Sequence, residues 1–333
     1  MKLKVLLSNT FDPWFNLATE DYIFRDMDPS YQVLYLWRNE NTVVIGRFQN
    51  PWVECNLAQM EKEGVKLARR TSGGGAVFHD LGNTNFTFMS SRENYSKEKN
   101  NQIIINALKK FGLTAIPSGR NDILIQDRKI SGSAFKETKD RSFHHGTLLI
   151  NANLTRLSNY LNPHPKKLEA KGITSVRARV ANLTDFEPKL NHDILIQEII
   201  EQFFQLYGSR SEIEILDDAS LKQIPELLKR YEELKDWNWR FGETPAFNHH
   251  LEEKFDWGFM DVHIDAHKGK MEKVKIFSDS LHPQMIELMM ESLAQKTYDA
   301  AGVKEAMGHV KQELPMIAEY LDEFESWLVR QIE

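Results

Sequence analysis

Two arginines, Arg69 and Arg70, stand just before three successive glycines at positions 73–75, and His79 and Asp80 follow shortly after. Three successive glycines lose much backbone entropy when they are ordered, so their place between two expected strands indicates a purpose. Without Cβ atoms, their N–H groups can approach and surround an anion such as a phosphate. The arginines could pair with a carboxylate or phosphate in forked geometry. The segment predicts an anion site. The alternative is a flexible hairpin turn, and the Gly-Lys-Ser/Thr ending of a P-loop is absent.

An acid and a lysine mark a second cluster. Asp122 begins one expected strand and Lys129 begins the next, across a turn at residues 126–128. A carboxylate and an ammonium group in these positions suit contacts to Mg²⁺ and to phosphate, respectively. The Ser-Gly-Ser-Ala run at 131–134 leaves space in which a ligand can lie. The alternatives are that Asp122 caps a turn and that Lys129 is an ordinary surface residue.

Two adjacent histidines, His144 and His145, form a third cluster on another expected strand. Neighbouring side chains on a strand point to opposite faces, so these two cannot bind one metal ion together without a bulge. We expect one of them to be structural and the other to line a pocket.

In this order, the three clusters resemble the lipoate–protein ligase family. The matching segments are 12–18 (DPWFNLA), 69–83 (RRTSGGGAVFHDLGN), 120–122 (RND), 129–134 (KISGSA), 144–149 (HHGTLL) and 171–177 (KGITSVR). The pieces WRFG at 239–242 and PAF at 245–247 resemble the start of the accessory domain of bacterial two-domain members. The resemblance covers essentially the whole chain.

The resemblance implies a two-step reaction. ATP and lipoate give lipoyl-AMP and pyrophosphate, and the lipoyl group then passes to a lysine amine of an acidic carrier domain. The implied carriers are the E2 subunits of 2-oxoacid dehydrogenases and the H protein of the glycine cleavage system. ATP is a substrate and Mg²⁺ is the implied metal. Some use of octanoate is expected, because an apolar pocket discriminates weakly between similar chains, by only ~1–3 kcal/mol per methylene.

The resemblance also implies roles for individual positions. Lys129 would contact the α-phosphate and the lipoyl carbonyl as an electrostatic clamp, not as a covalent nucleophile. Asp122 would contact the nucleotide or Mg²⁺. Arg70 and the backbone of residues 75–78 would hold the nucleotide and the adenylate. The full set of implied binding residues is Arg70, Ser72, Gly73, Gly74, Gly75, Ala76, Val77, Phe78, His79, Asn83, Asp122, Lys129, Ala134, His145 and Thr147.

Strands and helices must position these residues. Apolar and alternating runs predict strands at 32–37, 42–46, 65–69, 85–88, 122–125 and 145–150, with the first two forming a hairpin around 38–41. Helical patterns lie at 17–27, 56–63, 97–111 and 194–207. Closely spaced strands mixed with helices predict an α+β fold, with mixed, largely antiparallel sheets flanked by helices. The resemblance implies a fold like that of biotin and lipoate ligases.

A second unit is expected at the C-terminal end. Residues 209–247 are polar and irregular, which indicates a connector. We therefore predict a catalytic, lipoate- and ATP-binding domain at 1–246 and a small accessory domain at 247–333. In the latter, runs at 255–266 and 271–277 predict a hairpin, and helical patterns follow at 283–295, 301–313 and 316–332. This part should be a small α+β unit.

The charge distribution restricts the partners. Residues 248–333 hold 9 basic and 17 acidic side chains, and residues 1–247 hold 33 and 31. A general nucleic-acid binder would show a broad basic face, so no nucleic-acid partner is expected. A basic stretch at 166–179, with five basic residues and one acid, could be a solvated loop, a lid over the phosphate or a dock for an acidic carrier.

The sequence also indicates a compartment. A mean hydropathy of −0.48 and the lack of an apolar run near ~18 residues argue against a membrane span. The apolar stretch within residues 1–8 is too short for a secretory signal. With Cys55 as the one cysteine, no intramolecular disulfide and no cysteine metal cage can form. We expect a monomeric cytoplasmic enzyme.

Rival functions remain open at this point. A lipoyltransferase that uses preformed lipoyl-AMP shares nearly every motif, although the C-terminal unit favours the full ligase. An octanoyl-transferase would need a cysteine thioester, but Cys55 lies outside the three clusters and is expected to be a packed small side chain. A biotin ligase would carry a Gly-Arg-Gly-Arg-type loop, which is absent. A non-catalytic binder is hard to reconcile with Arg70, Asp122 and Lys129 together.

Overall fold

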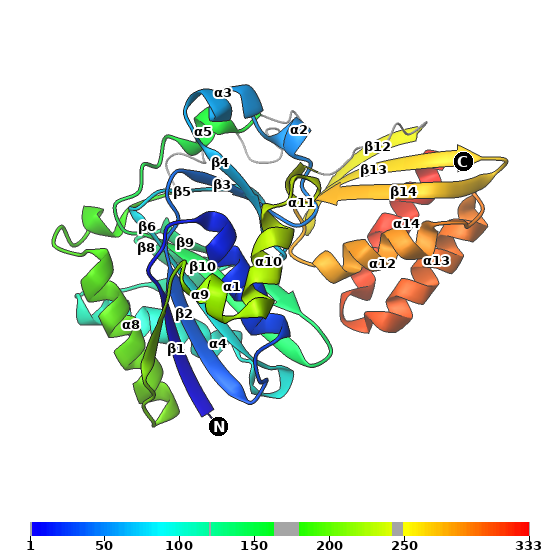
Figure 1. The fold of residues 1–333 in the computed structure, drawn as a ribbon. Helices are drawn as coiled ribbons and strands as arrows, with labels where there is room; N and C mark the ends of the chain where they lie inside the picture. The colour runs from blue at the N-terminus through cyan, green and yellow to red at the C-terminus, as the bar shows by residue number, and fades with distance from the viewer. Residues whose placement is uncertain (1, 120, 163–179, 242–248, 333) are drawn as a thin grey trace.

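The computed structural model of the chain describes residues 2–119, 121–162, 180–241 and 249–332. Among these residues the largest layer is a mixed eight-stranded sheet (Figure 1). Its strands lie in the order β11 (Ile213–Leu216), β1 (Lys2–Ser8), β2 (Tyr31–Trp37), β6 (Asn83–Ser91), β10 (Arg141–Leu149), β9 (Arg128–Glu137), β8 (Asp122–Ile125) and β7 (Ile116–Ser118). β1 runs parallel to β11 and β2, and the other neighbours are antiparallel. The predicted mixed, largely antiparallel sheet is confirmed.

Helices cover both faces of this sheet (Figure 1). On one face, α4 (Lys97–Lys110) and α8 (His192–Tyr207) bury an apolar layer against β2, β6 and β10. On the other face, α1 (Pro13–Arg25) packs against α10 (Pro225–Lys235). The α1 helix begins where the Asp12 carboxylate accepts the Trp14 N–H. The α8 helix ends at Gly208, whose φ of +69° suits glycine. The helices predicted at 17–27, 97–111 and 194–207 are confirmed.

A second, smaller sheet packs beside the first. Its order is β4 (Lys66–Arg69), β3 (Thr42–Ile45) and β5 (Val77–His79). The short helices α3 (Leu57–Lys62) and α5 (Leu157–Tyr160) lie against it, and α2 (Pro51–Glu54) precedes α3 in the chain. The predicted hairpin of 32–37 with 42–46 is wrong, because β2 pairs with β1 and β6 whereas β3 pairs with β4 and β5. Residues 33–37 are buried on both faces of the main sheet, and such a continuous apolar run does not reveal its neighbours. Residues 38–41 therefore connect two sheets.

The stretch at 209–247 is not the irregular connector that the sequence predicts. Its described part contains β11, α9 (Ser220–Gln223), α10 and α11 (Trp237–Phe241). β11 extends the main sheet as an edge strand, so most of its side chains are exposed. Only Leu227 and Leu234 of α10 are buried, which leaves a weak apolar pattern. The polar composition of these elements reflects their place at the edge and surface of the molecule.

The C-terminal unit is a three-stranded antiparallel sheet with helices on one face (Figure 1). The strands are β12 (His249–Phe255), β13 (Gly258–His267) and β14 (Lys270–Ser278), and the helices are α12 (Pro283–Leu293), α13 (Ala300–Glu313) and α14 (Ala318–Ile332). The predicted β13–β14 hairpin and the three helices are confirmed, and β12 was missed. Met260, Val262 and Ile264 of β13 face the helices in one apolar core.

Short 3₁₀ helices lie at Arg92–Asn94, Leu183–Asp185 and Pro315–Ile317. In the described ranges, no helix combines the length and apolar character needed to cross a lipid bilayer.

Candidate active site

One face of the main sheet gathers residues from all three sequence clusters. His145 of β10 lies opposite Thr87 of β6 and Ala134 of β9. Two residues further along the strands, Thr147 lies opposite Asn85. Alternate residues of a strand share a face. The side chains brought together on this face, called the site face below, include Asn83, Asp122, Ala134, His145 and Thr147.

A loop of residues 70–76, called the glycine loop below, lies against the site face. The Ser72 hydroxyl forms a 2.8 Å hydrogen bond with His145 Nε2. A Cβ atom on Gly74 would lie 3.9 Å from the Cβ atom of Ala134. Gly74 has a φ of +91°, which other residues rarely adopt. The first and third clusters, far apart in the sequence, therefore meet here.

Arg70 braces the glycine loop from inside. Its guanidinium donates to the Gly73 carbonyl at 2.7 and 3.0 Å, to the Gly75 carbonyl at 2.8 Å and to Ser72 Oγ at 3.1 Å. Burial lowers the pKa of Arg70 to about 10, partly offset by the charge of Glu20, so the guanidinium stays charged at neutral pH. The sequence suggests a forked pair with a ligand anion, whereas here the fork holds loop carbonyls.

Arg69 also binds the backbone. It donates to the carbonyls of Gln49 at 2.7 Å and Arg47 at 3.0 Å, and to those of Trp239 at 2.7 Å and Arg240 at 2.9 Å. Burial lowers the pKa of Arg69 to about 10. These bonds tie the small sheet to α11, so Arg69 has a structural role in this arrangement.

Glu20 of α1 joins a buried polar chain that the sequence analysis missed. Its carboxylate oxygens lie 3.0 and 3.1 Å from His145 Nδ1, while Nε2 of the same ring meets Ser72. Glu20 also accepts a hydrogen bond from the Thr87 hydroxyl, whose oxygen accepts the Trp37 indole N–H at 3.0 Å. Glutamate on a helix usually lies at the surface, so the sequence does not reveal that Glu20 is buried.

Aromatic rings and unsatisfied polar atoms surround the part of the site face that holds Glu20 and His145, called its histidine end below. The Trp37 ring lies 6.0 Å from that of His79 and opposite Asn85 in the strand register. Asn83 Oδ1, Asn85 Nδ2 and His79 Nε2 are buried and have no hydrogen-bond partner within the described part of the chain. Burial, with the positive charge of Arg70, lowers the pKa of His79 to about 3. Because buried polar atoms are normally paired, a polar group of a ligand would satisfy them here.

Lys129 and Asp122 form an ion pair at the other end of the site face. Lys129 Nζ lies 2.7 Å from Asp122 Oδ1. The register between β8 and β9 shifts at this point, and such a bulge re-aims side chains. A Cβ atom on Gly132 would lie 2.9 Å from Lys129 Nζ, so glycine at this position leaves room for the amine. The Gly132 N–H donates to the Thr147 hydroxyl at 3.3 Å. Lysine, carboxylate and small residues are therefore assembled as one group.

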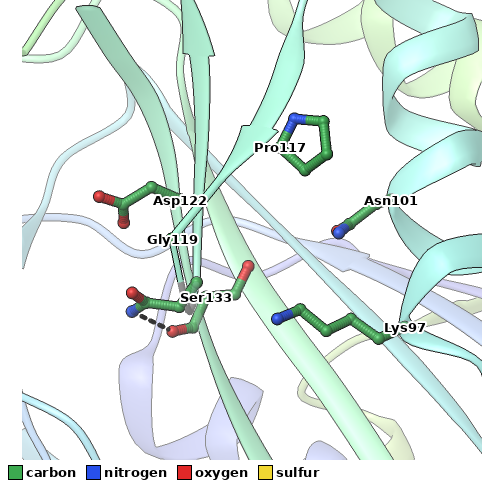
Figure 2. Close-up of a pocket in the computed structure, with 7 residues that line it drawn as sticks. Lys97, Asn101, Pro117, Gly119, Asp122 and Ser133 are labelled. Carbon is green, nitrogen blue, oxygen red and sulfur yellow. Dashed lines mark hydrogen bonds between the residues drawn. The ribbon is translucent and has the colours of Figure 1, made fainter. Parts of the chain in front are cut away.

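A small pocket opens beside this pair, between α4 and the strands β7, β8 and β9 (Figure 2). Its volume of about 20 Å³ leaves room for a water molecule. Lys97 and Asn101 of α4 line one side, and Asp122 and Ser133 line the other. Figure 2 shows the Asp122 carboxylate turned away from Lys97 and Asn101, so the pocket and the ion pair with Lys129 lie on different sides of Asp122.

The C-terminal unit touches the glycine loop directly. The Gly74 N–H donates to the Ser280 carbonyl at 2.9 Å, so this N–H is already paired. A Cβ atom on Gly73 would lie only 2.1 Å from the same carbonyl oxygen, which explains why glycine stands there. By contrast, a Cβ atom on Gly75 would meet nothing within 4 Å.

Some candidate residues lie apart from this group. His144 faces the opposite side of β10, where its ring lies 4.7 Å from Phe135 and 5.5 Å from Phe86. Burial lowers the pKa of His144 to about 3. These contacts are those of a structural histidine, and the pocket role of His145 stays a prediction. On β5, the Phe78 ring packs 5.4 Å from Tyr160. The basic stretch at 166–179 lies outside the described residues.

The environment of Cys55 does not favour a nucleophilic thiolate. It is buried in the apolar core of the small sheet with Val43, Ile45 and Met60. Burial, reinforced by Glu54, raises the pKa of the Cys55 thiol to about 12. The expectation of a packed small side chain is confirmed.

The sequence matches two protein families. Residues 12–204 match the lipoyl protein ligase A/B catalytic domain, and residues 244–328 match the bacterial lipoate protein ligase C-terminus. These matches define the class of the protein as a lipoyl ligase catalytic domain followed by a bacterial ligase C-terminal domain. The chain is 54% identical to the lipoate-protein ligase A of Psychrobacter cryohalolentis, over the full length of both proteins. It is also 54% identical to that of Bdellovibrio bacteriovorus, over all of this chain and 99% of the relative.

Solved structures of lipoate ligases resemble this chain in fold. P. falciparum LipL1, solved in complex with lipoate, matches with a TM-score of 0.88 and 33% identity, over 98% of this chain and 99% of the other. The bipartite lipoate protein ligase of Thermoplasma acidophilum matches with a TM-score of 0.65 and 28% identity, over 75% of this chain and all of the other. A lipoate-protein ligase A bound with ATP matches with a TM-score of 0.63 and 27% identity, over 73% and 99%. The chain belongs to the lipoate-protein ligase A family and is a ligase.

Proposed function

We propose that this enzyme activates lipoate with ATP to lipoyl-AMP and then transfers the lipoyl group to a lysine of a carrier domain. The observation that carries the proposal is the division of the site face into two chemically different ends. Lys129 and Asp122 lie at one end, and the Glu20–His145 pair lies among aromatic rings at the other. Lipoate carries a carboxylate, which suits the Lys129 ammonium, and an apolar ring, which suits the aromatic rings of Trp37 and Phe143 beside the polar Glu20–His145 pair at the histidine end.

In the first step, a lipoate carboxylate oxygen attacks the α-phosphorus of ATP. A bond forms between these atoms, the bond from the α-phosphorus to the bridging oxygen breaks, and pyrophosphate leaves. Negative charge builds on the phosphoryl oxygens, and the Lys129 ammonium, held 2.7 Å from Asp122, would stabilise it. Lys129 acts as a fixed charge that contacts the α-phosphate and the lipoyl carbonyl, so no covalent enzyme intermediate is needed.

The residues fit a magnesium ion that accompanies the nucleotide. Mg²⁺ is usually bound by one or two carboxylates together with substrate phosphates and water. Asp122 offers such a carboxylate, partly exposed and 2.7 Å from Lys129 Nζ. When bound there, the ion would neutralise phosphate charge.

The glycine loop would hold the nucleotide and the adenylate through its backbone. Arg70 keeps the loop in shape through the Gly73 and Gly75 carbonyls, so its contribution to binding passes largely through the loop. The unsatisfied buried atoms of Asn83 and His79 would accept polar groups of the ligand.

In the second step, a lysine amine of the carrier attacks the acyl carbon of lipoyl-AMP. An amide bond forms, the bond from that carbon to the phosphate oxygen breaks, and AMP leaves while the amine gives up a proton. The adenylate is a reactive mixed anhydride, so positioning the amine supplies much of the acceleration. Excluding water protects the adenylate from hydrolysis.

The proposed protein partners are acidic carrier domains, namely E2 subunits of 2-oxoacid dehydrogenases and the glycine cleavage H protein. The Thermoplasma acidophilum match supports this class, since it was described as a lipoylation system with its E2 lipoyl domain. Octanoate would serve as a second acid, because it has the same eight-carbon chain and carboxylate as lipoate and lacks only the two ring sulfurs, and an apolar pocket discriminates weakly between such chains.

We also propose that the chain divides at residues 246 and 247 and works as a monomer in the cytoplasm. The apolar core of the C-terminal unit supports the division, since Phe48 is the one buried member that the described catalytic part contributes. The single, buried Cys55 is compatible with a reducing compartment.

Lipoate-dependent release of pyrophosphate tests the proposal. Purified protein is given ATP and Mg²⁺ with and without lipoate, and pyrophosphate is measured. We expect release only with lipoate. If no pyrophosphate forms but synthetic lipoyl-AMP still modifies the carrier, the enzyme is a transferase that uses preformed adenylate.

A further inference from the structure

Four ligand-type side chains share one face of the β12–β13 pair in the C-terminal unit. His250 lies opposite His263, and Glu252 lies opposite Asp261. His250 and Glu252 are two residues apart on β12, as are Asp261 and His263 on β13, so their side chains point to the same side. Two imidazoles and two carboxylates thus form a square on adjacent strands.

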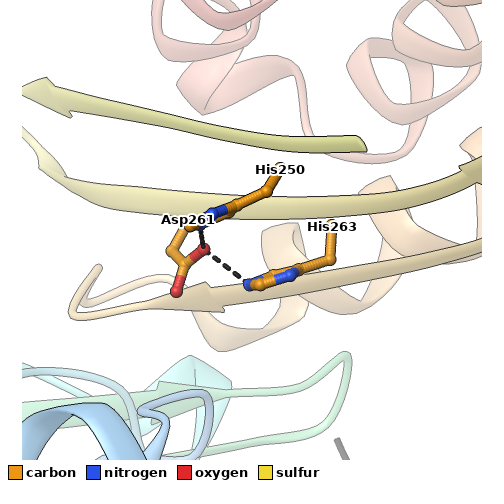
Figure 3. A group of neighbouring side chains, drawn as sticks. All are labelled: His250, Asp261 and His263. Atoms are coloured by element: carbon orange, nitrogen blue, oxygen red, sulfur yellow. Dashed lines mark hydrogen bonds and ion pairs between the residues drawn. The ribbon is translucent and has the colours of Figure 1, made fainter. Parts of the chain in front are cut away.

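Three of these side chains converge on one point. His250 Nε2 and His263 Nε2 lie 2.8 and 2.7 Å from the same oxygen, Asp261 Oδ1 (Figure 3). The two rings are stacked, with centroids 4.4 Å apart and planes 13° from parallel. One ligand atom from each residue lies within 4.8 Å of the other two.

The surrounding fold holds these donors in place. Asp261 is buried and His263 is half-buried, while His250 faces solvent and leaves a path for an ion to enter. The alternate residues of β13 point the other way into the apolar core. Strands packed on a core position donors more firmly than a surface loop does.

The face that carries the cluster is turned toward the catalytic part of the chain. Lys275 of β14 is the strand neighbour of His263. The positive charges of Arg47 and Arg69, in the catalytic part, act on the Lys275 ammonium. An ion bound at the cluster would therefore lie on the side of the sheet nearest the other domain.

We propose that His250, Asp261 and His263 form a binding site for a divalent transition-metal ion, with Zn²⁺ as the best match. Imidazole nitrogen suits zinc, copper and nickel, and two histidines with a carboxylate leave a fourth position of a zinc tetrahedron open. Glu252, whose carboxylate oxygen lies 3.4 Å from His250 Nε2, could fill it. Zinc bonds near 2 Å require ligand atoms about 3.3 Å apart, so each histidine nitrogen needs to move away from Asp261 Oδ1 by only about half an ångström.

The site differs from the one proposed for ATP, where a single carboxylate suits Mg²⁺. Imidazole ligands disfavour Mg²⁺, which prefers oxygen. A bound zinc ion would cross-link β12 to β13 at the start of the C-terminal unit and raise the stability of that unit.

Zinc titration of the full-length, tag-free protein tests the proposal. After removal of metal with a chelator, Zn²⁺ alone is titrated by calorimetry, and Co²⁺ is used as a spectroscopic probe. We expect one strong Zn²⁺ site per chain and cobalt absorption bands of tetrahedral strength. His250→Ala and His263→Ala should each weaken binding by more than about tenfold.

His249→Ala is the matched control. His249 is the next residue on β12 but points to the other face, where its ring lies 4.8 Å from that of Tyr298. This variant should bind zinc as the wild type does. Absence of saturable zinc binding, or equal binding by the wild type and the His250 and His263 variants, would overturn the proposal. His250 is exposed, so its replacement should leave the fold intact.

Discussion

Replacing Lys129 with alanine should abolish most activation while leaving the fold intact. In the structure, the Lys129 ammonium touches Asp122 at 2.7 Å and lies beside Gly132. The two side chains of this ion pair are 35% and 33% exposed. The same residue is therefore placed to act on the reaction and is only weakly engaged in holding the protein together.

The expected losses of stability and of activity on replacing Lys129 differ in size. An ion pair of this exposure contributes about 0.2–1 kcal/mol to the free energy of unfolding, because water and salt screen it. Loss of a fixed group that stabilises transition-state charge costs about 10²–10³-fold in kcat, or ~2.7–4 kcal/mol. Lys129→Ala should thus lower pyrophosphate release by about 10²–10³-fold, with a change in unfolding free energy of under about 1 kcal/mol.

The assay combines pyrophosphate release with urea unfolding of the same samples. Arg128→Ala is the matched control, since Arg128 is the adjacent residue and pairs with Asp185 at 2.9 Å at a similar exposure of 41% and 40%. It should lose the same small stability and keep its activity. The reasoning would be refuted if Lys129→Ala retained activity within a few-fold of the wild type. It would also be refuted if both variants lost activity equally.

Three further predictions concern the glycine loop, the lone thiol and the buried histidines. Gly73→Ala should cost about 1–3 kcal/mol of unfolding free energy through overlap with a carbonyl of the C-terminal unit, whereas Gly75→Ala should be nearly neutral; thermal unfolding of both checks this. Cys55, whose pKa is raised to about 12 by burial, should resist thiol reagents until urea unfolds the protein, and rapid labelling of the folded enzyme would contradict its packing. Burial lowers the pKa of His79 and of His144 to about 3, so protonation favours the unfolded state. The free energy of unfolding should therefore be highest above pH ~6.5 and fall toward pH 4 by up to about 1.4 kcal/mol per pH unit for each histidine, and His144→Phe should reduce this slope in urea titrations.

The sequence predicts the site best where chemistry and backbone constraint coincide. Gly73 and Gly74 stand out because a Cβ atom at the first would meet a carbonyl and the second has a positive φ. Lys129 and Asp122 stand out because they flank one turn. In both cases the residues that act together are close in the sequence, so their spacing carries the information.

The missed features depend on contacts between distant segments. Glu20 is buried against His145, 125 positions away, and a single acid in a helix does not reveal such a partner. The first two predicted strands belong to different sheets because neighbouring segments of the main sheet come from far along the chain. β11 and α10 were missed because surface elements bury few apolar side chains.

The most direct test of the account is the mass of an apo carrier domain after incubation with the protein, ATP, Mg²⁺ and lipoate. The account predicts an increase by one lipoyl amide on a single lysine, dependent on ATP and strongly reduced by Lys129→Ala. An unmodified carrier under these conditions, with pure folded protein, would contradict the assignment of the site face as a ligase active site.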